Sequence, residues 1–439
     1  MKRNRLKLLG YQGLCFAVLT TVCFAGEIPA PRFPDIPAVR SAEDLQPGVR
    51  TALRRYNMEN IEAGASVLLV TDRTLDPLLA EAFQKYVAGR GARIDVVVLN
   101  GFPDEREPAQ LLDRWGDNWW PQWLWKAATE YDYLLNMTYL VIGYTYQEGQ
   151  EVRRWLNRYG VRPAMNIRHS VEKLAYRPYA QFPEELILAI NRKVVESVPR
   201  GRVEVNLTSP QGTDLWLEHD YTEDLEEFEK EGVPRYSMQI SAVPTRFKNA
   251  RGKIVTSGSH VGMLKEPVTL WIENSQVQRV EGGNGLDVYL NPILEKFDSV
   301  DFGTHGGPGI RWVEEITFTS HPKQFAIIKE GDAFSGLFDN WSGAHYRSGA
   351  IHIAIGGSQG GPPPPAGIGK GYHFVFELYF PTLVIGGRTL IENGRLLVLD
   401  DPEVRALAGK LGSSEDWLKE AWIPAVPGIN TEKASTGSQ

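Results

Sequence analysis

Two short apolar runs separated by a helical pattern constrain the fold of the first half of the chain. Residues 65–72 and 94–99 have the composition of buried strands, and residues 75–90 between them place Leu, Ala and Phe at helical spacing. Asp76 and Pro77 are typical of a helix start. A strand, a crossover helix and a second strand form a β-α-β unit with parallel strands. We therefore predict a doubly wound α/β domain over residues 46–200.

From residue 201 the pattern changes to short alternating runs, such as V-E-V-N-L-T and V-T-L-W-I-E, separated by Gly, Asn and Pro. This pattern is typical of strand-rich, mixed or antiparallel structure. We predict an overall α/β chain whose second domain, residues 201–425, is strand-rich and α+β. A Pro-rich arm at 26–45 and a disordered tail at 426–439 flank the two domains.

The first 25 residues have the pattern of a secretory signal peptide. Lys2, Arg3, Arg5 and Lys7 precede an apolar run that ends at Ala25, the expected cleavage point. An uncleaved membrane anchor is the alternative. Both cysteines of the chain lie in this segment, so the remainder has no disulfide and no thiolate ligand. We expect a periplasmic or secreted protein with no membrane-spanning segment after signal removal.

The net charge of the chain limits the kinds of partner that we expect it to bind. The whole sequence carries a formal charge of −7, and removing the four basic residues of the signal makes it more acidic. Because an acidic protein repels nucleic acid and anionic membrane, we expect neither as a partner. A small-molecule substrate is the expected ligand.

Five of the eight histidines lie between residues 301 and 380: His305, His321, His345, His352 and His373. His321, His352 and His373 fall in strand-like phrases, and imidazole and carboxylate are usual ligands of zinc and non-haem iron. Since alternate strand residues share a face, His373 and Glu377 should point the same way. The sequence thus predicts a divalent-metal site here. For any single histidine, a hydrogen-bonded core residue is the alternative.

Two other segments are candidates for substrate contact. Trp119 and Trp123 belong to a run of five tryptophans and would share a helix face, as an aromatic wall or as ordinary core. Residues 356–371 form a Gly- and Pro-rich loop between two histidine-bearing strands. This loop is either a lid or an inert connector.

Four phrases give residues 50–400 a resemblance to a known fold group. They are S-P-Q-G-T-D-L, R-W-V-E-E-I with T-S-H-P, S-G-A-I-H-I-A-I-G, and Y-H-F-V-F-E followed by I-E-N-G. In order and spacing they resemble the aminopeptidase T family, a group of metallo-aminopeptidases whose fold is shared with the iron-dependent 2,5-dihydroxypyridine 5,6-dioxygenases. The resemblance also implies a homo-oligomer.

The resemblance to the peptidases implies a two-metal site in which Glu315, His352 and His373 match ligands. The chain departs from the peptidase pattern at three places: Met238 to Ile240 replace Gly-Glu-Val, Gln359 replaces a Tyr, and Val375 replaces an Asp. Losing two carboxylates removes the negative charge that holds two divalent ions together. This makes the two-metal interpretation doubtful and leaves Gln359 as a candidate substrate contact.

The resemblance to the dioxygenases implies one Fe(II) ion with two histidines and one carboxylate. Their histidines match His321 and His373, and their Asp again falls on Val375. The carboxylate would then come from Glu315 or, less directly, from Glu377. His305 is a candidate acid/base residue in a T-H-G-G-P-G loop, although an ordinary surface histidine is the alternative.

Three functions follow from these observations. The first is an exported metal enzyme, with Fe(II) preferred to Zn, that cleaves a small hydroxylated aromatic or heteroaromatic ring. The second is a metallo-aminopeptidase with altered ligands, in which Glu314 or Glu315 is the base. The third is a non-catalytic binding protein on the same fold.

Overall fold

The computed structural model describes residues 28–73, 75–99, 121–138, 156–164, 167, 169–259, 262–301, 307–326, 346–356 and 373–431. The signal segment, His305, Trp119, Gln359 and most of the 356–371 loop lie outside these ranges. In the described part of the chain, no helix has the length and apolar character needed to cross a membrane.

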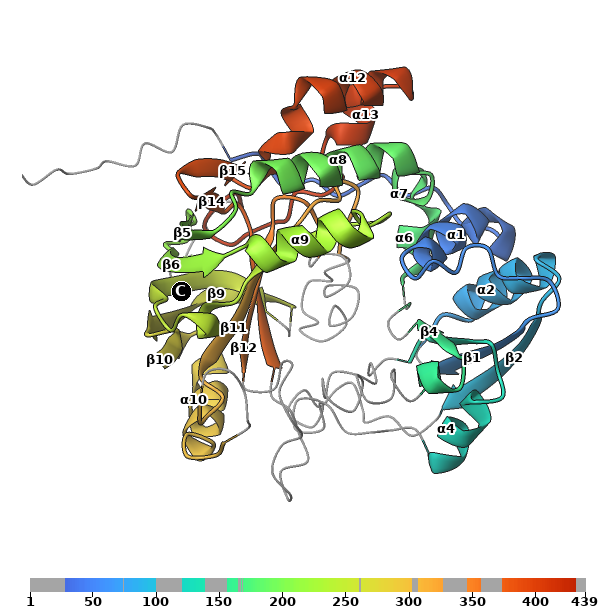
Figure 1. Ribbon diagram of the computed structural model, residues 1–439, viewed down its shortest axis with the longest axis horizontal. Coiled ribbons are helices and arrows are strands. Elements are labelled where there is room, and N and C mark those ends of the chain that lie inside the picture. Colours follow the sequence, from blue (N-terminus) through green and yellow to red (C-terminus); the bar gives the residue numbers. More distant parts are fainter. Residues whose placement is uncertain are drawn as a thin grey trace, which may run out of the picture.

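The N-terminal half forms a parallel sheet with helices around it, as the β-α-β pattern predicts (Figure 1). The sheet order is β2-β1-β3-β4, and every pairing is parallel. Helix α2 begins where expected, because Asp76 accepts a hydrogen bond from the Leu78 amide and Pro77 occupies the first turn. The elements are a 3₁₀ turn at Ala42–Leu45, α1 (Gln46–Arg54), β1 (Ser66–Asp72), α2 (Pro77–Gly89), β2 (Arg93–Leu99), α4 (Gln122–Ala128), β3 (Tyr133–Asn136), β4 (Arg162–Ala164), α6 (Val171–Ala175) and α7 (Arg177–Ala180).

The C-terminal half is built on a second sheet, which has twelve strands in the described part of the chain. Its elements are α8 (Glu184–Ser197), β5 (Arg202–Thr208), β6 (Asp214–Asp220), α9 (Thr222–Glu231), β7 (Gln239–Ala242), a 3₁₀ turn at Pro244–Arg246, β8 (Arg251–Ser259), β9 (Gly262–Glu273), β10 (Gln276–Gly282), α10 (Leu286–Lys296), β11 (Trp312–Thr319), β12 (Ile351–Gly356), β13 (His373–Leu378), β14 (Thr382–Ile385), β15 (Arg388–Glu392), β16 (Arg395–Leu396), a 3₁₀ turn at Leu397–Asp400, α12 (Pro402–Lys410) and α13 (Ser414–Leu418). The predicted α/β chain with a strand-rich second half is confirmed.

The larger sheet closes on itself. Strands β8 to β13 are paired in sequence order, all antiparallel, and β13 also pairs with β8, so these six strands form a ring. Strand β7 pairs with β11, and β6, β5, β14, β15 and β16 extend the sheet beyond β8. This ring holds the three histidine-bearing phrases next to one another.

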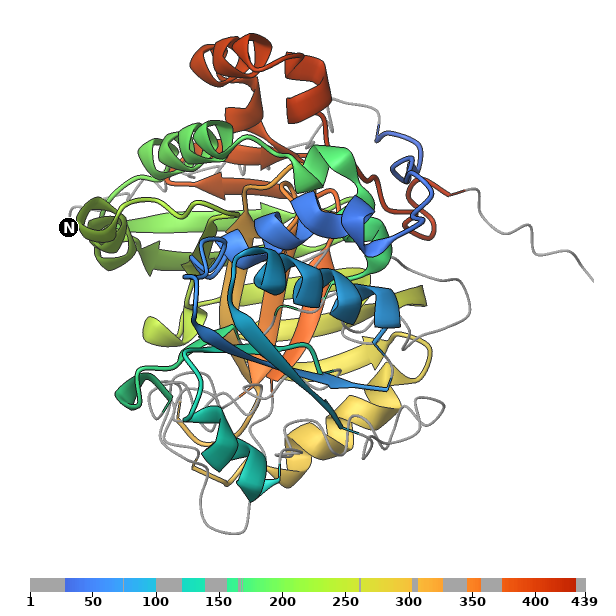
Figure 2. The same cartoon turned by 90° about the vertical axis from the view of Figure 1, so that its right-hand side faces the viewer.

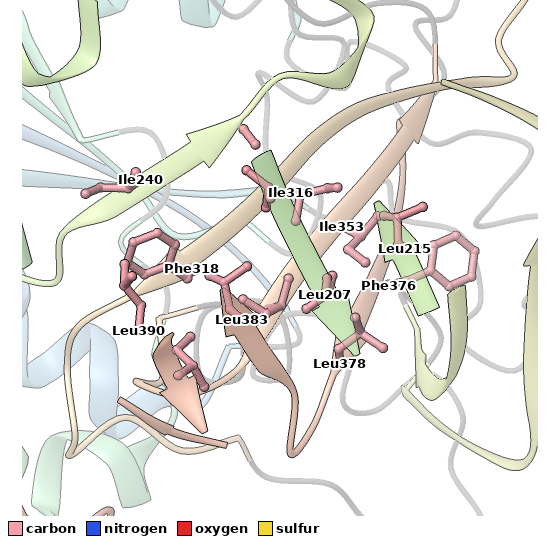
Figure 3. Close-up of a cluster of buried hydrophobic side chains, with 14 of the residues drawn as sticks. Leu207, Leu215, Ile240, Ile316, Phe318, Ile353, Phe376, Leu378, Leu383 and Leu390 are labelled. Carbon is pink, nitrogen blue, oxygen red and sulfur yellow. The ribbon is translucent and has the colours of Figure 1, made fainter. Parts of the chain in front are cut away.

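One face of the larger sheet carries its hydrophobic core (Figure 3). Ile316 of β11, Ile353 of β12 and Phe376 of β13 point into it, together with residues of β5, β6, β14 and β15. Because successive strand residues point to opposite faces, the residues between these apolar ones lie on the other face. That second face receives Glu315, His352 and Glu377.

Helix α8 packs on the larger sheet rather than on the parallel one. Leu186, Ile190 and Val194 belong to the same buried cluster as strands β5 and β6, and the cluster begins at Phe182. Figure 2 shows α1 and α2 in front of this sheet, in a separate layer. The change of packing partner therefore falls near residue 182, ahead of the predicted boundary at residue 200.

The Pro-rich arm and the C-terminal segment are packed together. Arg32 and Ile423 exchange two backbone hydrogen bonds of 3.0 and 2.8 Å, and the ring centroids of Phe33 and Phe325 are 5.4 Å apart. Val426 is fully buried, and Asn430 donates to the carbonyls of Pro29 and Pro424. The described residues 426–431 thus pack against the Pro-rich arm and the segment before them.

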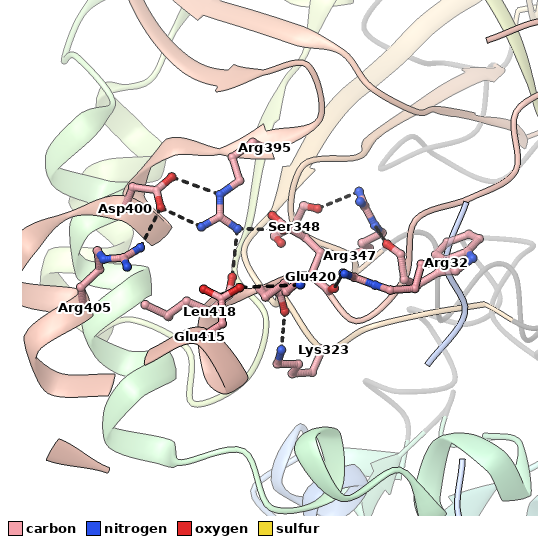
Figure 4. A network of polar contacts seen from close by, with 12 residues as sticks. Arg32, Lys323, Arg347, Ser348, Arg395, Asp400, Arg405, Glu415, Leu418 and Glu420 are labelled. Carbon is pink, nitrogen blue, oxygen red and sulfur yellow. Dashed lines mark hydrogen bonds and ion pairs between the residues drawn. The ribbon is translucent and has the colours of Figure 1, made fainter. Parts of the chain in front are cut away.

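A polar network fixes this junction (Figure 4). The guanidinium of Arg347, 3% exposed, donates to the carbonyls of Trp422 and Ser348 at 2.9 Å. Arg395 pairs with Asp400 and Glu420. Buried cations are stable only when such hydrogen bonds replace water, so the network ties residues 415–426 to the start of β12.

Arg347→Met should destabilise the protein, because it leaves the two buried carbonyls without a donor. We expect the free energy of unfolding to fall by about 3 kcal/mol, from two charge-assisted hydrogen bonds, as measured by urea denaturation. Arg405→Met removes a half-exposed arginine at 48% side-chain exposure and should change stability by less than about 1 kcal/mol. Equal effects of the two substitutions would contradict the structural role of Arg347.

Candidate functional site

Three neighbouring strands bring Glu315, His352 and Glu377 together on the polar face. Strand β12 lies between β11 and β13, and His352 is directly opposite Thr317 on one side and Glu377 on the other. The pairing of β11 with β12 has a register shift, a β-bulge or irregularity, between Val313 and Glu315. Residues on three separate strands thus meet across two strand pairings.

The imidazole of His352 is held between the two carboxylates. Its Nε2 lies 2.9 Å from Glu315 Oε1, and its Nδ1 lies 3.0 Å from Glu377 Oε1. His352 is 1% exposed and Glu377 4%. Glu377 Oε2 is also buried and accepts no hydrogen bond from the described residues. A buried polar group is tolerated when it is paired, so this arrangement accounts for an imidazole in an apolar strand.

The two carboxylates determine the charge of His352. Burial alone would lower its pKa, but the charges and hydrogen bonds of Glu377 and Glu315 act in the opposite direction and raise the pKa to about 9. The pKa of Glu377 is raised, because burial outweighs the lowering effect of His352. At neutral pH, with no metal bound, His352 is therefore an imidazolium between two acidic groups.

The strands behind this group are held close by a glycine. A Cβ at Gly258 of β8 would lie 2.3 Å from the carbonyl oxygen of Glu377 and 2.9 Å from its Cβ. Thr256 on the same strand donates to that carbonyl at 2.6 Å. The sequence showed Gly258 only as one glycine among 43, and its role follows from the β13–β8 pairing that closes the ring.

The neighbouring positions on this face are hydroxylated or small. Ser241 of β7 and Thr317 of β11 are within hydrogen-bonding distance, with their hydroxyl oxygens 2.5 Å apart. Val375, the position at which the resemblance implies Asp, is 2% exposed and lies opposite Ala354, which lies opposite Glu315. On β13 it is the carboxylate of Glu377, two residues after Val375, that contacts His352.

His321 lies away from this group. It is 2% exposed and packed against the rings of Phe182, Tyr236 and Tyr179, with centroid distances of 4.6, 5.7 and 5.8 Å. Its Nδ1 accepts a hydrogen bond from the Lys323 amide. Burial and nearby cations hold its pKa well below the ordinary value of 6.5, so the ring is neutral.

The backbone register corrects the expectation that His321 and His373 bind one ion. His321 bridges to Arg347, ahead of the start of β12, whereas His373 is opposite Gly356 at the end of β12. The length of β12 separates the two by roughly 17 Å at about 3.3 Å per residue. Both histidines therefore cannot ligate the same ion in this arrangement. The position of the His373 side chain lies outside the described structure.

Of the remaining candidate residues, Glu314 and Trp123 lie within the described structure. Glu314 is 6% exposed at the irregularity of β11, and Glu315 rather than Glu314 contacts His352. Trp123 on α4 is 57% exposed, so its ring faces solvent and does not wall a buried site. His305, Trp119 and Gln359 lie outside the described residues, and their roles stay predictions.

The described residues provide part of a metal site. Two ligand atoms at about 2.1 Å from one ion and near a right angle lie about 3 Å apart, which fits the 2.9 Å between His352 Nε2 and Glu315 Oε1. Among the described residues, however, no group of three or more His, Cys, Asp or Glu is arranged to hold a metal ion. Glu315 and His352 thus fit two positions around an ion, with Glu377 orienting the imidazole.

Comparison with solved structures finds a protein of similar fold. The structure is similar to that of 2,5-dihydroxypyridine dioxygenase from Pseudomonas putida KT2440, with a TM-score of 0.55, 15% sequence identity, and coverage of 83% of this chain and 99% of that one. AmpT from Thermus thermophilus aligns over 81% of this chain and 99% of its own at 13% identity, with a TM-score of 0.45, too low to add to the argument. No family model and no curated protein matches the sequence.

The likeness to the dioxygenase confirms the expected fold group. The chain has the fold on which the Pseudomonas putida enzyme is built, with a parallel α/β part followed by a large antiparallel sheet. At 15% identity the likeness concerns the fold and not the activity. The chemistry of this chain therefore depends on the residues of its own polar face.

The charge of His352 predicts a pH dependence of stability in metal-free protein. Because the folded pKa of about 9 lies above the ordinary value of 6.5, the stabilising contribution is fully present below pH 6.5 and lost as the pH rises past 9. Unfolding free energies of the wild type and of His352→Gln, measured with chelator from about pH 5 to 10, should converge at the alkaline end. A difference that grows with rising pH would contradict the assigned contacts.

Proposed function

We propose that the chain is an exported, metal-dependent enzyme whose single ion binds on the polar face of β11, β12 and β13. The observation that carries the proposal is the contact of His352 with Glu315 on one nitrogen and with Glu377 on the other. A carboxylate that holds the second nitrogen of a histidine fixes its tautomer and its direction, as is usual for metal-binding histidines. Glu315 and His352 are the proposed ligands, and Glu377 is the orienting residue.

Glu377, Glu315 and the apolar face of the sheet would each favour metal binding beside His352. Binding would displace the proton from His352 Nε2, while Glu377 would keep the proton on Nδ1 and so hold the ring neutral and correctly turned. Glu315 would provide a negative charge that offsets the charge of the cation. The apolar opposite face of the sheet, with Ile351 and Ile353 fully buried, keeps the backbone rigid.

A single ion is better supported than two. The described polar face has two carboxylates next to one imidazole, and one of those carboxylates is engaged with the second nitrogen of His352. A dinuclear peptidase centre requires more negative charge than this to hold two divalent ions a few ångströms apart. Neither an aminopeptidase with altered ligands nor a binding protein is favoured by a specific contact in the described structure.

The proposed reaction is oxidative cleavage of a small hydroxylated aromatic or heteroaromatic ring. Support comes from the fold shared with a dioxygenase named for 2,5-dihydroxypyridine. Fe(II), when bound, would supply the oxygen-activating chemistry of such an enzyme. Thr317 and Tyr346, at 1% and 3% exposure, would exclude water and position the substrate. Burial raises the pKa of Tyr346 and outweighs the lowering effect of the Arg55 charge, so its hydroxyl stays protonated and would donate to a substrate oxygen.

Export and oligomerisation are also proposals. Export rests on the basic and apolar pattern of residues 1–25, and mass measurement of the mature chain tests it, since cleavage would leave Gly26 at the N terminus. A homo-oligomer is proposed from the family resemblance, and light scattering of purified protein would test it.

Metal analysis separates the proposed roles. Protein purified without oxygen should hold one iron per chain and oxidise 2,5-dihydroxypyridine or a related hydroxylated ring. His352→Ala and Glu315→Gln should abolish uptake, whereas Glu377→Gln should weaken the affinity by about 10- to 100-fold without abolishing binding. Glu273→Gln, an exposed carboxylate on β9, is the matched control and should change nothing.

Each alternative function gives a different result in this experiment. Two zinc ions per chain with peptide hydrolysis would replace the proposed dioxygenase by a metallo-aminopeptidase. Metal uptake that is unchanged in His352→Ala would show that the ion binds elsewhere. No uptake by the wild type under any condition would leave a binding protein as the function.

A further inference from the structure

The phrase S-P-Q-G-T-D-L, one of the four that carry the family resemblance, supplies none of the proposed metal ligands. Its residues 209–213 form the loop between β5 and β6. The loop is closed by its own hydrogen bonds, because the Gly212 amide donates to the Ser209 carbonyl at 3.0 Å and the Thr213 amide donates to the Ser209 hydroxyl at 3.3 Å. These bonds fix the places from which the side chains of Gln211 and Thr213 reach strand β8.

The two side chains continue the contact between β6 and β8 beyond the last backbone pair, which involves Asp214. The Thr213 hydroxyl accepts a hydrogen bond from the Val255 amide and donates one to the Val255 carbonyl, both at 2.9 Å. Gln211 Oε1 accepts from the Ser257 amide at 3.2 Å, and Gln211 Nε2 donates to the Ser257 hydroxyl at 2.8 Å. Side chains of the loop thus take the place of strand hydrogen bonds along β8.

Ser257 lies at an irregularity of β8. The register of β8 against β9 shifts between Thr256 and Gly258, so Ser257 has no opposite residue in the described pairing with β9. A bulge of this kind bends the strand and leaves the extra residue outside the ladder. Ser257 is fully buried, and a buried amide without a partner costs free energy. Gln211 provides the partner that β9 does not.

The residues on either side of Ser257 both contact the backbone of Glu377. Thr256 donates to the Glu377 carbonyl at 2.6 Å, and Gly258 is opposite Glu377 in the pairing of β8 with β13. The Gly258 amide also donates to the Thr256 hydroxyl at 3.0 Å. Because Glu377 Oε1 lies 3.0 Å from His352 Nδ1, a displacement of β8 at Ser257 would move this carboxylate away from the imidazole.

We propose that Gln211 is a positioning residue of the metal centre: by holding Ser257 at the bulge of β8, it keeps Glu377 in place to orient the imidazole of His352. The inference rests on the proposed function, in which Glu377 is the orienting residue. Gln211 acts through β8 and is not a ligand. The phrase S-P-Q-G-T-D-L then serves the site as a support for the strand that closes the ring.

The hydrogen bond between His352 and Glu377 can be observed by nuclear magnetic resonance in the metal-free full chain. With ¹⁵N-labelled histidine and a chelator at neutral pH, the wild type should give a far-downfield Nδ1 proton signal that is lost in His352→Gln. Gln211→Leu removes both hydrogen bonds to Ser257, so it should shift this signal upfield or broaden it.

Two further variants make this measurement specific for the amide group of Gln211. Gln211→Glu can still accept hydrogen bonds from the amide and the hydroxyl of Ser257, so it should preserve the wild-type signal. Gln278→Leu changes an exposed glutamine on β10 and is the matched control, which should leave the signal unchanged.

A double-mutant cycle separates positioning from a general loss of stability. Gln211→Leu should weaken the affinity for Fe(II), measured without oxygen, by about threefold to tenfold. In the background of Glu377→Gln the same substitution should have little further effect, because the residue through which Gln211 acts has already lost its carboxylate.

Circular dichroism checks whether Gln211→Leu is folded. If it is not, Ser257→Ala, which removes only the hydroxyl partner, replaces it and should shift the signal in the same direction. A wild type without the downfield signal, a signal unchanged in the folded variant, or equal losses of affinity in both backgrounds would overturn the proposal. The resonance measurement needs no metal, so a wild type that binds no iron would contradict the proposed function without deciding this test.

Discussion

The contact of His352 with two carboxylates is the interaction on which the rest of the site depends. An imidazole and two acidic groups, all largely buried, are stable together because each satisfies the charge or hydrogen-bonding capacity of another. Removing one member would leave the others buried without compensation. The contact therefore requires that β11, β12 and β13 keep one register, and the closed ring of strands enforces it.

The ring of strands links this interaction to the whole second half of the chain. Strand β13 is held on both sides, by β12 and by β8, and the absence of a side chain at Gly258 allows the second approach. The opposite face packs into one hydrophobic core with α8, α9 and α12. A rigid apolar face behind a polar one is a suitable support for a site whose side chains must be placed accurately.

Much of this arrangement can be predicted from the sequence, and the failures have physical causes. Alternation in I-H-I-A-I-G and Y-H-F-V-F-E correctly indicated strands, and the shared face of the residues two apart brought Glu377 into consideration. The pairing of His352 with Glu377 could not be derived, because strand register depends on long-range packing. His321 was expected beside His373, but it lies past the end of β11, where alternation no longer indicates direction. The helical period of α8 is identical whichever sheet it covers, so the sequence could not show that this helix packs on the larger sheet.

The most direct test of the central claim is the position of a bound ion. Crystals grown with Fe(II) without oxygen, measured at the iron absorption edge, should show one anomalous peak within about 2.2 Å of His352 Nε2 and Glu315 Oε1. Glu377 should then remain hydrogen-bonded to Nδ1. A peak beside His321, or an imidazole of His352 that stays paired with both carboxylates in the presence of the metal, would contradict the assignment of His352 and Glu315 as ligands.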